Sequence, residues 1–256
     1  MQTSLGHFLQ KRFFSDRVNR QAGFTSLPGH PLRHAGRVKD ASAIPAAGLI
    51  LELVAIFVAM PLAYRFSPVR IPALPLLWLV AGYAWWQLRR DSSFDQHKLW
   101  NPGPLTSQLP SILLFVVLVA ILLWAGVHWF APSLEWSFVR EHPRLWAVVM
   151  LLYPVLSVYP QGILYRAFFL HRYATVFPGT WAPILTSAFA FAFLHIIFRN
   201  SISVTLTFFG GLLFSWRYLE TGSLLTSSVE HALYGCWLFT VGLGTYFYHG
   251  VWPQPK

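Results

Sequence analysis

The chain has 256 residues, of which 55% are hydrophobic and only 11% are charged, and its mean hydropathy is +0.49. An ordinary soluble domain carries about 25% charged residues, so this composition excludes that class and predicts a protein that crosses a membrane several times. The 19 Lys and Arg outnumber the 9 Asp and Glu. They lie in the tail and in loops between apolar runs, so membrane topology explains them better than nucleic-acid binding, and we expect no nucleic-acid partner.

The first 43 residues form a polar segment with seven Lys and Arg. No apolar core of signal-peptide type follows a short basic start. We interpret residues 1–43 as a mostly disordered tail on the cytoplasmic side of the membrane. The stretch LGHFLQKRFF within this tail can alternatively lie on the membrane surface as a basic amphipathic helix.

Seven apolar runs follow the tail, and each can cross a hydrocarbon core of about 30 Å as a helix. They are Ile44–Tyr64, Ile71–Leu88, Ser111–Ala131, Leu145–Tyr165, Trp181–Phe198, Ile202–Leu219 and Leu224–Tyr248. The sequence therefore predicts an all-α, polytopic membrane protein with about seven transmembrane helices, the first of which occupy residues 44–144. With the N-terminus inside, 13 of the 19 Lys and Arg fall on the inner side. We therefore expect a cytoplasmic N-terminus, a bacterial inner membrane and membrane lipids as partners.

Ionisable side chains at membrane depth are costly and are candidates for function. Arg166, His195 and His231 lie on three different apolar runs, and we expect them to line one cavity, with the two imidazoles within about 12 Å of each other, a gap that one or two waters can bridge. For either histidine alone, a hydrogen-bonded packing role is the alternative. Glu52 and Glu230 are expected to pair with cations on other helices, although Glu230 could instead face the cavity.

The spacing of these residues resembles the CPBP family of CAAX-type and bacteriocin-processing intramembrane proteases, also called the Abi family. The family motifs are EExxxR, FxxxH and HxxxN, in that order. Arg166 in QGILYR matches the first motif, Phe191 and His195 in FAFLH match the second, and His231 in EHALYG matches the third. The resemblance covers roughly Leu145–Tyr248, so residues 145–248 are predicted to form a CPBP-like protease core.

The resemblance implies roles for these positions. In the family, the motif glutamate and the middle histidine are thought to activate water, while the last histidine and the asparagine stabilise the oxyanion. This chain departs from the pattern at the catalytic positions, because Gln161 and Gly162 replace the glutamate pair and Gly235 replaces the asparagine. Gln161 can orient a water but cannot accept its proton. The candidate catalytic residues are Gln161, Arg166, His195, His231 and, as a substitute base, Glu230.

The missing carboxylates leave the partner of Arg166 open on the sequence alone. Arg166 needs another partner, which could be a carbonyl, a lipid phosphate or Glu230. A glutamate introduced at position 162 would lie one turn from Arg166 and is expected to pair with it.

Three hypotheses about function stay open. The chain is an intramembrane endopeptidase that cleaves a membrane-associated peptide, a catalytically silent member of the same fold that acts as a membrane binding or accessory protein, or an unrelated small transporter component. We expect no cofactor. A metal held by His195 and His231 is possible but disfavoured, because a hydrolytic zinc site needs three protein ligands and water.

Overall fold

The computed structural model describes residues 45–69 and 71–247, and these residues form helices and connecting turns without a β-strand. The expected basic tail and its surface helix lie outside the described residues. The first helices are α2 (Ala46–Val54), the π-helical η1 (Ala55–Ala59) and α3 (Met60–Phe66), which run on as one rod, then α4 (Ala73–Arg90), the short 3-10 helix η2 (Gln96–Leu99) and α5 (Gly103–Phe130). The prediction of an all-α membrane protein is confirmed.

The second half begins with the short η3 (Pro132–Leu134) and α6 (Ser137–Glu141). One continuous helix then comprises α7 (Pro143–Tyr153), η4 (Pro154–Val158), α8 (Tyr159–Gly162), η5 (Ile163–Phe168) and α9 (Phe169–Arg172). The last elements are α10 (Trp181–Leu194), η6 (His195–Phe198), α11 (Ser201–Thr221), α12 (Leu224–Val241) and η7 (Leu243–Phe247). Side chains cap two of these helices: Asn200 accepts from the Ser203 amide and Ser223 accepts from the Thr226 amide.

Within the described residues, each of the seven apolar runs is largely helical, but the predicted count of seven spans is not confirmed. Among the described residues, five helical segments are long and apolar enough to cross a membrane: Ala46–Phe66, Gln96–Phe130, Pro143–Arg172, Trp181–Phe198 and Ser201–Thr221. The remaining two runs correspond to α4 and α12. The first ends in Arg89 and Arg90, and the second carries Glu230 and His231, so both are less apolar.

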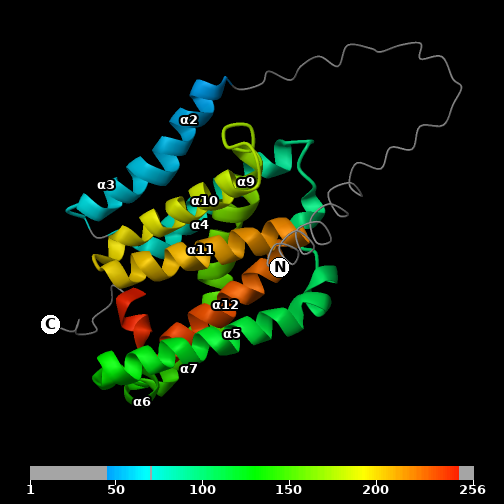
Figure 1. The fold of residues 1–256 in the computed structure, drawn as a ribbon. Helices are drawn as coiled ribbons and strands as arrows, with labels where there is room; N and C mark the ends of the chain where they lie inside the picture. The colour runs from blue at the N-terminus through cyan, green and yellow to red at the C-terminus, as the bar shows by residue number, and fades with distance from the viewer. Residues whose placement is uncertain (1–44, 70, 248–256) are drawn as a thin grey trace, which may run out of the picture. The chain divides into compact units, whose positions relative to one another are not determined.

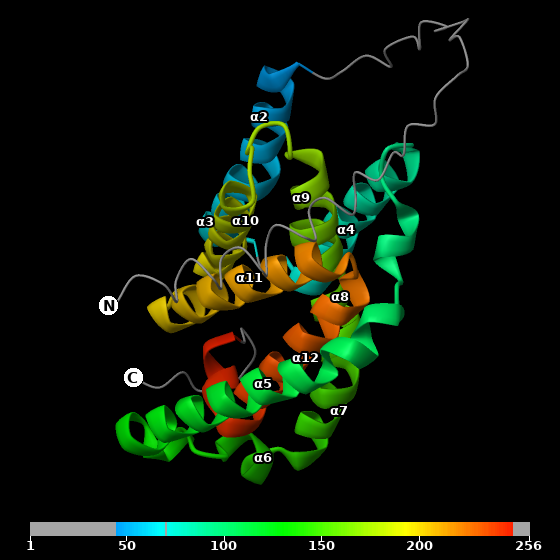
Figure 2. The same ribbon diagram turned by 45° about the vertical axis from the view of Figure 1, so that its right-hand side comes forward.

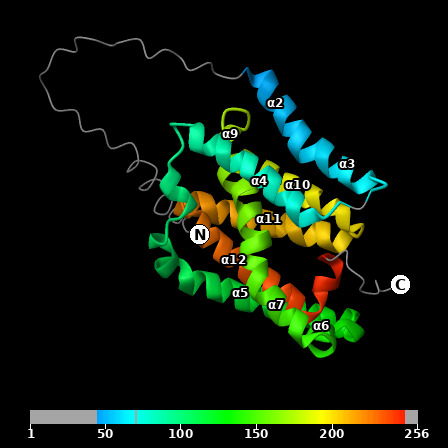
Figure 3. The ribbon, with the colours of Figure 1, turned by 180° about the vertical axis from the view of Figure 1, so that it is seen from behind.

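The helix of residues 143–172 crosses its neighbours steeply, as Figures 1 and 3 show. It contains Pro154 and Pro160, which lack an amide hydrogen and cannot complete the ordinary helical ladder. Two π-helical stretches, η4 and η5, accommodate them within the same helix. Around this helix, α10 packs along α11 and α5 packs along α12 (Figures 1 and 2). The crossing helix therefore contacts both groups of helices.

Aromatic rings join the crossing helix to α10 and to the first rod. Phe57 of η1 meets Tyr165 and Phe169 edge-on, with ring centroids 5.4 and 5.0 Å apart. Tyr165 meets Phe191 of α10 at 5.2 Å. Such pairs contribute about 0.5–1.5 kcal/mol each beyond the area they bury. This cluster fixes where η5 and the end of α10 lie relative to each other.

Two ion pairs confirm that Glu52 and Glu230 pair with cations on other helices. Glu52 lies 3.0 Å from Arg172, and Glu230 lies 2.7 Å from Arg217. Arg166 and Arg217 are included in the count of 13 inner-side cations, but each is buried within a helix. Without these two, 11 rather than 13 of the Lys and Arg fall on the inner side, so the charge bias behind the predicted orientation is smaller.

Candidate active site

A cavity of about 1620 Å³ lies between the end of α3, the start of α4, the crossing helix and α10–α12. Most of its wall is apolar. Gln161, His195 and His231 line it, whereas Arg166 and Glu230 do not. The structure therefore brings three of the five predicted site residues to one surface.

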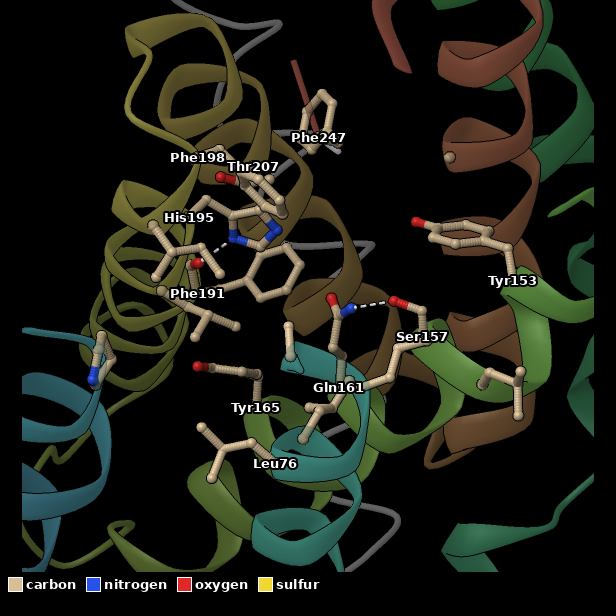
Figure 4. A pocket seen from close by; sticks show the side chains of 18 of the residues that line it. Leu76, Tyr153, Ser157, Gln161, Tyr165, Phe191, His195, Phe198, Thr207 and Phe247 are labelled. Carbon is tan, nitrogen blue, oxygen red and sulfur yellow. Dashed lines mark hydrogen bonds between the residues drawn. The ribbon is translucent and has the colours of Figure 1, made fainter. Parts of the chain in front are cut away.

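His195 is held in one tautomer by the end of its own helix. α10 ends at Leu194, and the Nδ1 atom of His195 lies 2.7 Å from the carbonyl oxygen of Phe191 (Figure 4). A carbonyl oxygen only accepts hydrogen bonds, so Nδ1 carries the hydrogen and donates it. This bond satisfies one of the carbonyls that a helix end leaves open. The Nε2 atom, which has no hydrogen-bond partner in the described part of the chain, keeps its lone pair free.

Gln161 presents its carbonyl oxygen to the cavity. Its Nε2 atom donates to Ser157 Oγ at 2.7 Å, one turn back along the crossing helix (Figure 4). That bond uses the amide nitrogen and leaves Oε1 available as an acceptor. Gln161 can therefore hold a water molecule, as expected from the sequence.

His231 is surrounded by aromatic rings and has one polar contact. Its ring stacks on Phe214, with centroids 4.4 Å apart, and Phe191 meets it edge-on at 5.6 Å. Phe191 also lies 4.8 Å from the ring of His195. The two imidazole centroids therefore cannot be further apart than the sum of these two ring distances, which is below the expected limit of about 12 Å. The Nε2 atom of His231 lies 3.4 Å from the Tyr153 hydroxyl.

Among the described residues, Arg166 pairs with neither a carbonyl nor Glu230, which are two of the partners expected from the sequence. It is 1% exposed, and its three guanidinium nitrogens have no hydrogen-bond partner among the described residues. The guanidinium carbon instead lies 4.5 Å from the ring centroid of Phe191 and 5.1 Å from that of Phe214. Arg166 is also close enough to both histidines to interact with them electrostatically. Its charge thus lies in the wall behind the cavity.

The expectation that Glu230 could face the cavity as a substitute base is wrong for this structure. Both carboxylate oxygens accept from Arg217, at 2.7 and 3.1 Å, and Gln108 accepts from the same guanidinium. Both charged side chains are almost fully buried. A carboxylate bound in this two-pronged way is held by its ion pair, away from the cavity.

The two glycines that depart from the motifs are packed against neighbours. A Cβ at Gly162 would lie 3.0 Å from Leu224 Cδ1 and 3.1 Å from Ser228 Oγ. A Cβ at Gly235 would overlap the ring and hydroxyl of Tyr153. A glutamate at position 162 therefore reaches Arg166 only if Leu224 and Ser228 of α12 shift, and its expected pairing with Arg166 stays a prediction.

The donor set around the cavity does not make a metal centre. Within the described ranges, no group of three or more His, Cys, Asp or Glu side chains could hold a metal ion. No carboxylate pairs with His195 in that part of the chain either. A histidine pair alone lacks the third ligand of a hydrolytic zinc site. That the protein needs no metal stays a prediction.

Comparison with known proteins matches one segment of the chain to a family. Residues 143–237 match a family model described as type II CAAX prenyl endopeptidase Rce1-like. The match supports the resemblance of this segment to the CPBP/CAAX-protease family. Neither the curated proteins nor the solved structures that were compared gave a match. The family segment contains Gln161, Arg166, His195 and His231, and it speaks against the transporter hypothesis.

Two residues at the candidate active site were not expected from the sequence. Ser157 holds the Gln161 amide, and its place one turn before Gln161 was a signal that could have been used. Tyr153 contacts His231 from 78 positions away, and no spacing in the sequence indicates that contact.

Proposed function

We propose that this protein is an intramembrane endopeptidase that cleaves a membrane-associated peptide within the apolar cavity. The observation that carries the proposal is the geometry of His195, whose Nδ1 is occupied by the Phe191 carbonyl while Nε2 is free at the cavity. A neutral imidazole in this tautomer is a general base. The base that the motif glutamate would supply is thus replaced by the histidine itself.

The reaction uses Gln161 and His195 together. Gln161 Oε1 accepts a hydrogen bond from a water molecule and aims its oxygen at the substrate carbonyl carbon. His195 Nε2 takes the proton of that water as its oxygen attacks the carbon. The same proton then passes to the leaving nitrogen as the peptide bond breaks. The buried charge of Arg166 stabilises the negative charge that develops in the intermediate.

The prenylated C-terminal peptide named in the matched family model is the first substrate to test. Most of the cavity wall is apolar, which suits a lipid-modified peptide in a bilayer. Purified protein in detergent is incubated with a farnesylated peptide ending in a C-a-a-X sequence, and the released tripeptide is measured by mass spectrometry. A membrane-tethered peptide reporter without a prenyl group is tested in parallel.

His195→Ala is expected to abolish cleavage. The matched control is His97→Ala, because His97 is exposed in η2 and does not line the cavity. Cleavage by wild type and by His97→Ala but not by His195→Ala supports the proposal. Cleavage that survives His195→Ala overturns it.

A second candidate function rests on the missing carboxylate. Because no carboxylate pairs with His195 in the described residues and Glu230 is bound to Arg217, the protein could instead bind a membrane peptide without cleaving it. Wild type that binds the peptide probes but cleaves neither would favour this accessory role.

We also propose a bacterial inner membrane with the N-terminus on the cytoplasmic side. The Lys and Arg distribution supports this orientation. Reporter fusions that are active on only one side of a membrane, placed at each end of the chain, test it. Activity of an N-terminal fusion on the outer side would contradict it.

A further inference from the structure

Tyr153 is the last residue of α7 and lines the cavity. Its hydroxyl points toward the side of the cavity on which His195 and Gln161 lie (Figure 4). The ring is held edge-on by Phe239, with centroids 5.4 Å apart, and by His231 at 6.3 Å. The hydroxyl is therefore placed by packing before any substrate arrives.

The hydroxyl occupies space that α12 leaves empty. Gly235, one turn after His231, lacks a side chain, and a Cβ there would come within 2.6 Å of Tyr153 Cζ and overlap the hydroxyl oxygen. Only glycine at this position lets the phenol reach the cavity. The asparagine that the family motif has at this position is absent, and a different polar group stands in its place.

The hydrogen of this hydroxyl is available to a ligand when His231 carries its own hydrogen on Nε2. The only hydrogen-bonding contact of Tyr153 among the described residues is with His231 Nε2, at 3.4 Å. With the proton of neutral His231 on Nε2, that N–H donates to the phenol oxygen. The phenolic hydrogen is then free to point at an acceptor in the cavity.

We propose that Tyr153 is the hydrogen-bond donor to the substrate carbonyl oxygen, and that His231 is the residue that positions it. This inference rests on the proposed function. As water attacks the carbonyl carbon and His195 takes the water proton, the carbonyl π pair moves onto oxygen. The resulting oxyanion accepts the Tyr153 hydrogen bond. When the oxygen pair re-forms the carbonyl, the carbon–nitrogen bond breaks and His195 returns the proton to the leaving nitrogen.

The test is Tyr153→Phe, which removes one oxygen and keeps the ring. With the farnesylated peptide as probe, kcat is expected to fall by about 10²–10³-fold with little change in KM, the loss seen when one oxyanion donor is removed. The matched control is Tyr218→Phe, because Tyr218 lies in α11 and does not line the cavity. It is expected to cleave at the wild-type rate.

Two more variants keep the test decisive if Tyr153→Phe folds poorly. Gly235→Ala should displace the phenol and lower kcat by a similar factor. The double variant Tyr153→Ala with Gly235→Asn places a carboxamide donor in the vacated space and should recover most of the lost rate. A merely structural tyrosine would not be rescued in this way.

The outcomes separate the two proposals. If wild type cleaves in a His195-dependent manner but Tyr153→Phe cleaves at the full rate, only the role of Tyr153 is overturned. If Tyr153→Phe does not fold and Gly235→Ala keeps the full rate, the role is overturned as well. If wild type cleaves neither peptide probe, the proposed function fails and this inference fails with it.

Discussion

The guanidinium of Arg166 lies 4.5 Å from the ring centroid of Phe191, deep in the protein and without a hydrogen-bond partner in the described residues. A buried cation without a polar partner is costly, and the face of an aromatic ring repays part of that cost. Because Phe191 also contacts both histidines of the cavity, one ring links the buried charge to the candidate active site. The unpaired charge of Arg166 therefore lowers the stability of the fold, while the proposed reaction uses the same charge.

Arg166→Met should therefore be at least as stable as wild type. Methionine fills much of the same volume without the unpaired charge, and replacing buried charges by apolar residues of similar size is often neutral or stabilising by about 1–4 kcal/mol. The melting temperature in detergent should stay equal or rise, by roughly 2–4 °C per kcal/mol. The melting temperature of Arg166→Ala should be lower than that of Arg166→Met, because alanine leaves a cavity between Phe191 and Phe214. If both variants lose stability equally, the charge itself stabilises the fold.

Gln161→Glu should raise the cleavage rate. The new carboxylate can accept from the Ser157 hydroxyl, to which the amide now donates, and can take the water proton. General-base catalysis contributes about 10²–10⁴-fold, so an increase of that order is expected with the farnesylated peptide. Combined with His195→Ala, the gain should be lost if both groups act on one water. An unchanged rate in Gln161→Glu would show that position 161 does not contact the attacking water.

Gly162→Glu should destabilise the protein rather than stabilise it. The side chain would have to displace Leu224 and Ser228, which a Cβ alone already approaches within 3.0 and 3.1 Å. Overpacking of this kind costs about 1–3 kcal/mol, measured as a lower melting temperature in detergent. The control is Gly82→Ala, where a Cβ meets nothing within 4 Å. If Gly162→Glu instead raises the melting temperature, and the double variant Gly162→Glu with Arg166→Met does not, the introduced carboxylate pairs with the guanidinium of Arg166.

Asp91, outside the membrane-spanning helices, predicts a pH-dependent contribution to stability. The hydrogen bonds from Ser93, aided by His171, lower the pKa of Asp91 from 3.8 to about 2. As the pH falls, the unfolded chain takes up this proton before the folded chain does, so the contribution is full above about pH 4 and lost toward about pH 2. The melting-temperature difference between wild type and Asp91→Asn should shrink over that interval. A difference that stays constant from pH 6 to pH 2 would contradict this assignment.

The sequence predicted the helices and much of the site because both depend on local patterns. The apolar runs mark every long helix, and the motif spacing identified His195, His231 and Gln161, which share one cavity. The sequence did not show that Arg166 and Arg217, counted among the inner-side cations, are buried, because hydropathy treats a buried cation and a loop cation alike. Both helices continue past these residues. Arg166 lies over an aromatic ring, and Arg217 forms an ion pair with Glu230.

Contacts between distant segments could not be predicted in this way. That Tyr153 fills the space beside Gly235 depends on how the crossing helix passes α12, and the two π-helical stretches around Pro154 and Pro160 determine that path. Hydrophobic periodicity assumes a regular turn, so it cannot give the face that a side chain presents after such a stretch.

The bond from His195 Nδ1 to the Phe191 carbonyl makes the proposed catalytic base part of a helix terminus. The hydrogen that closes the last turn of α10 is the same one that keeps Nε2 unprotonated and facing the cavity. Fraying of that single turn would free the imidazole to rotate and to exchange its tautomer without any change elsewhere in the protein. The equilibrium between the closed and the frayed last turn of α10 therefore also determines the fraction of molecules in which His195 Nε2 can accept a proton.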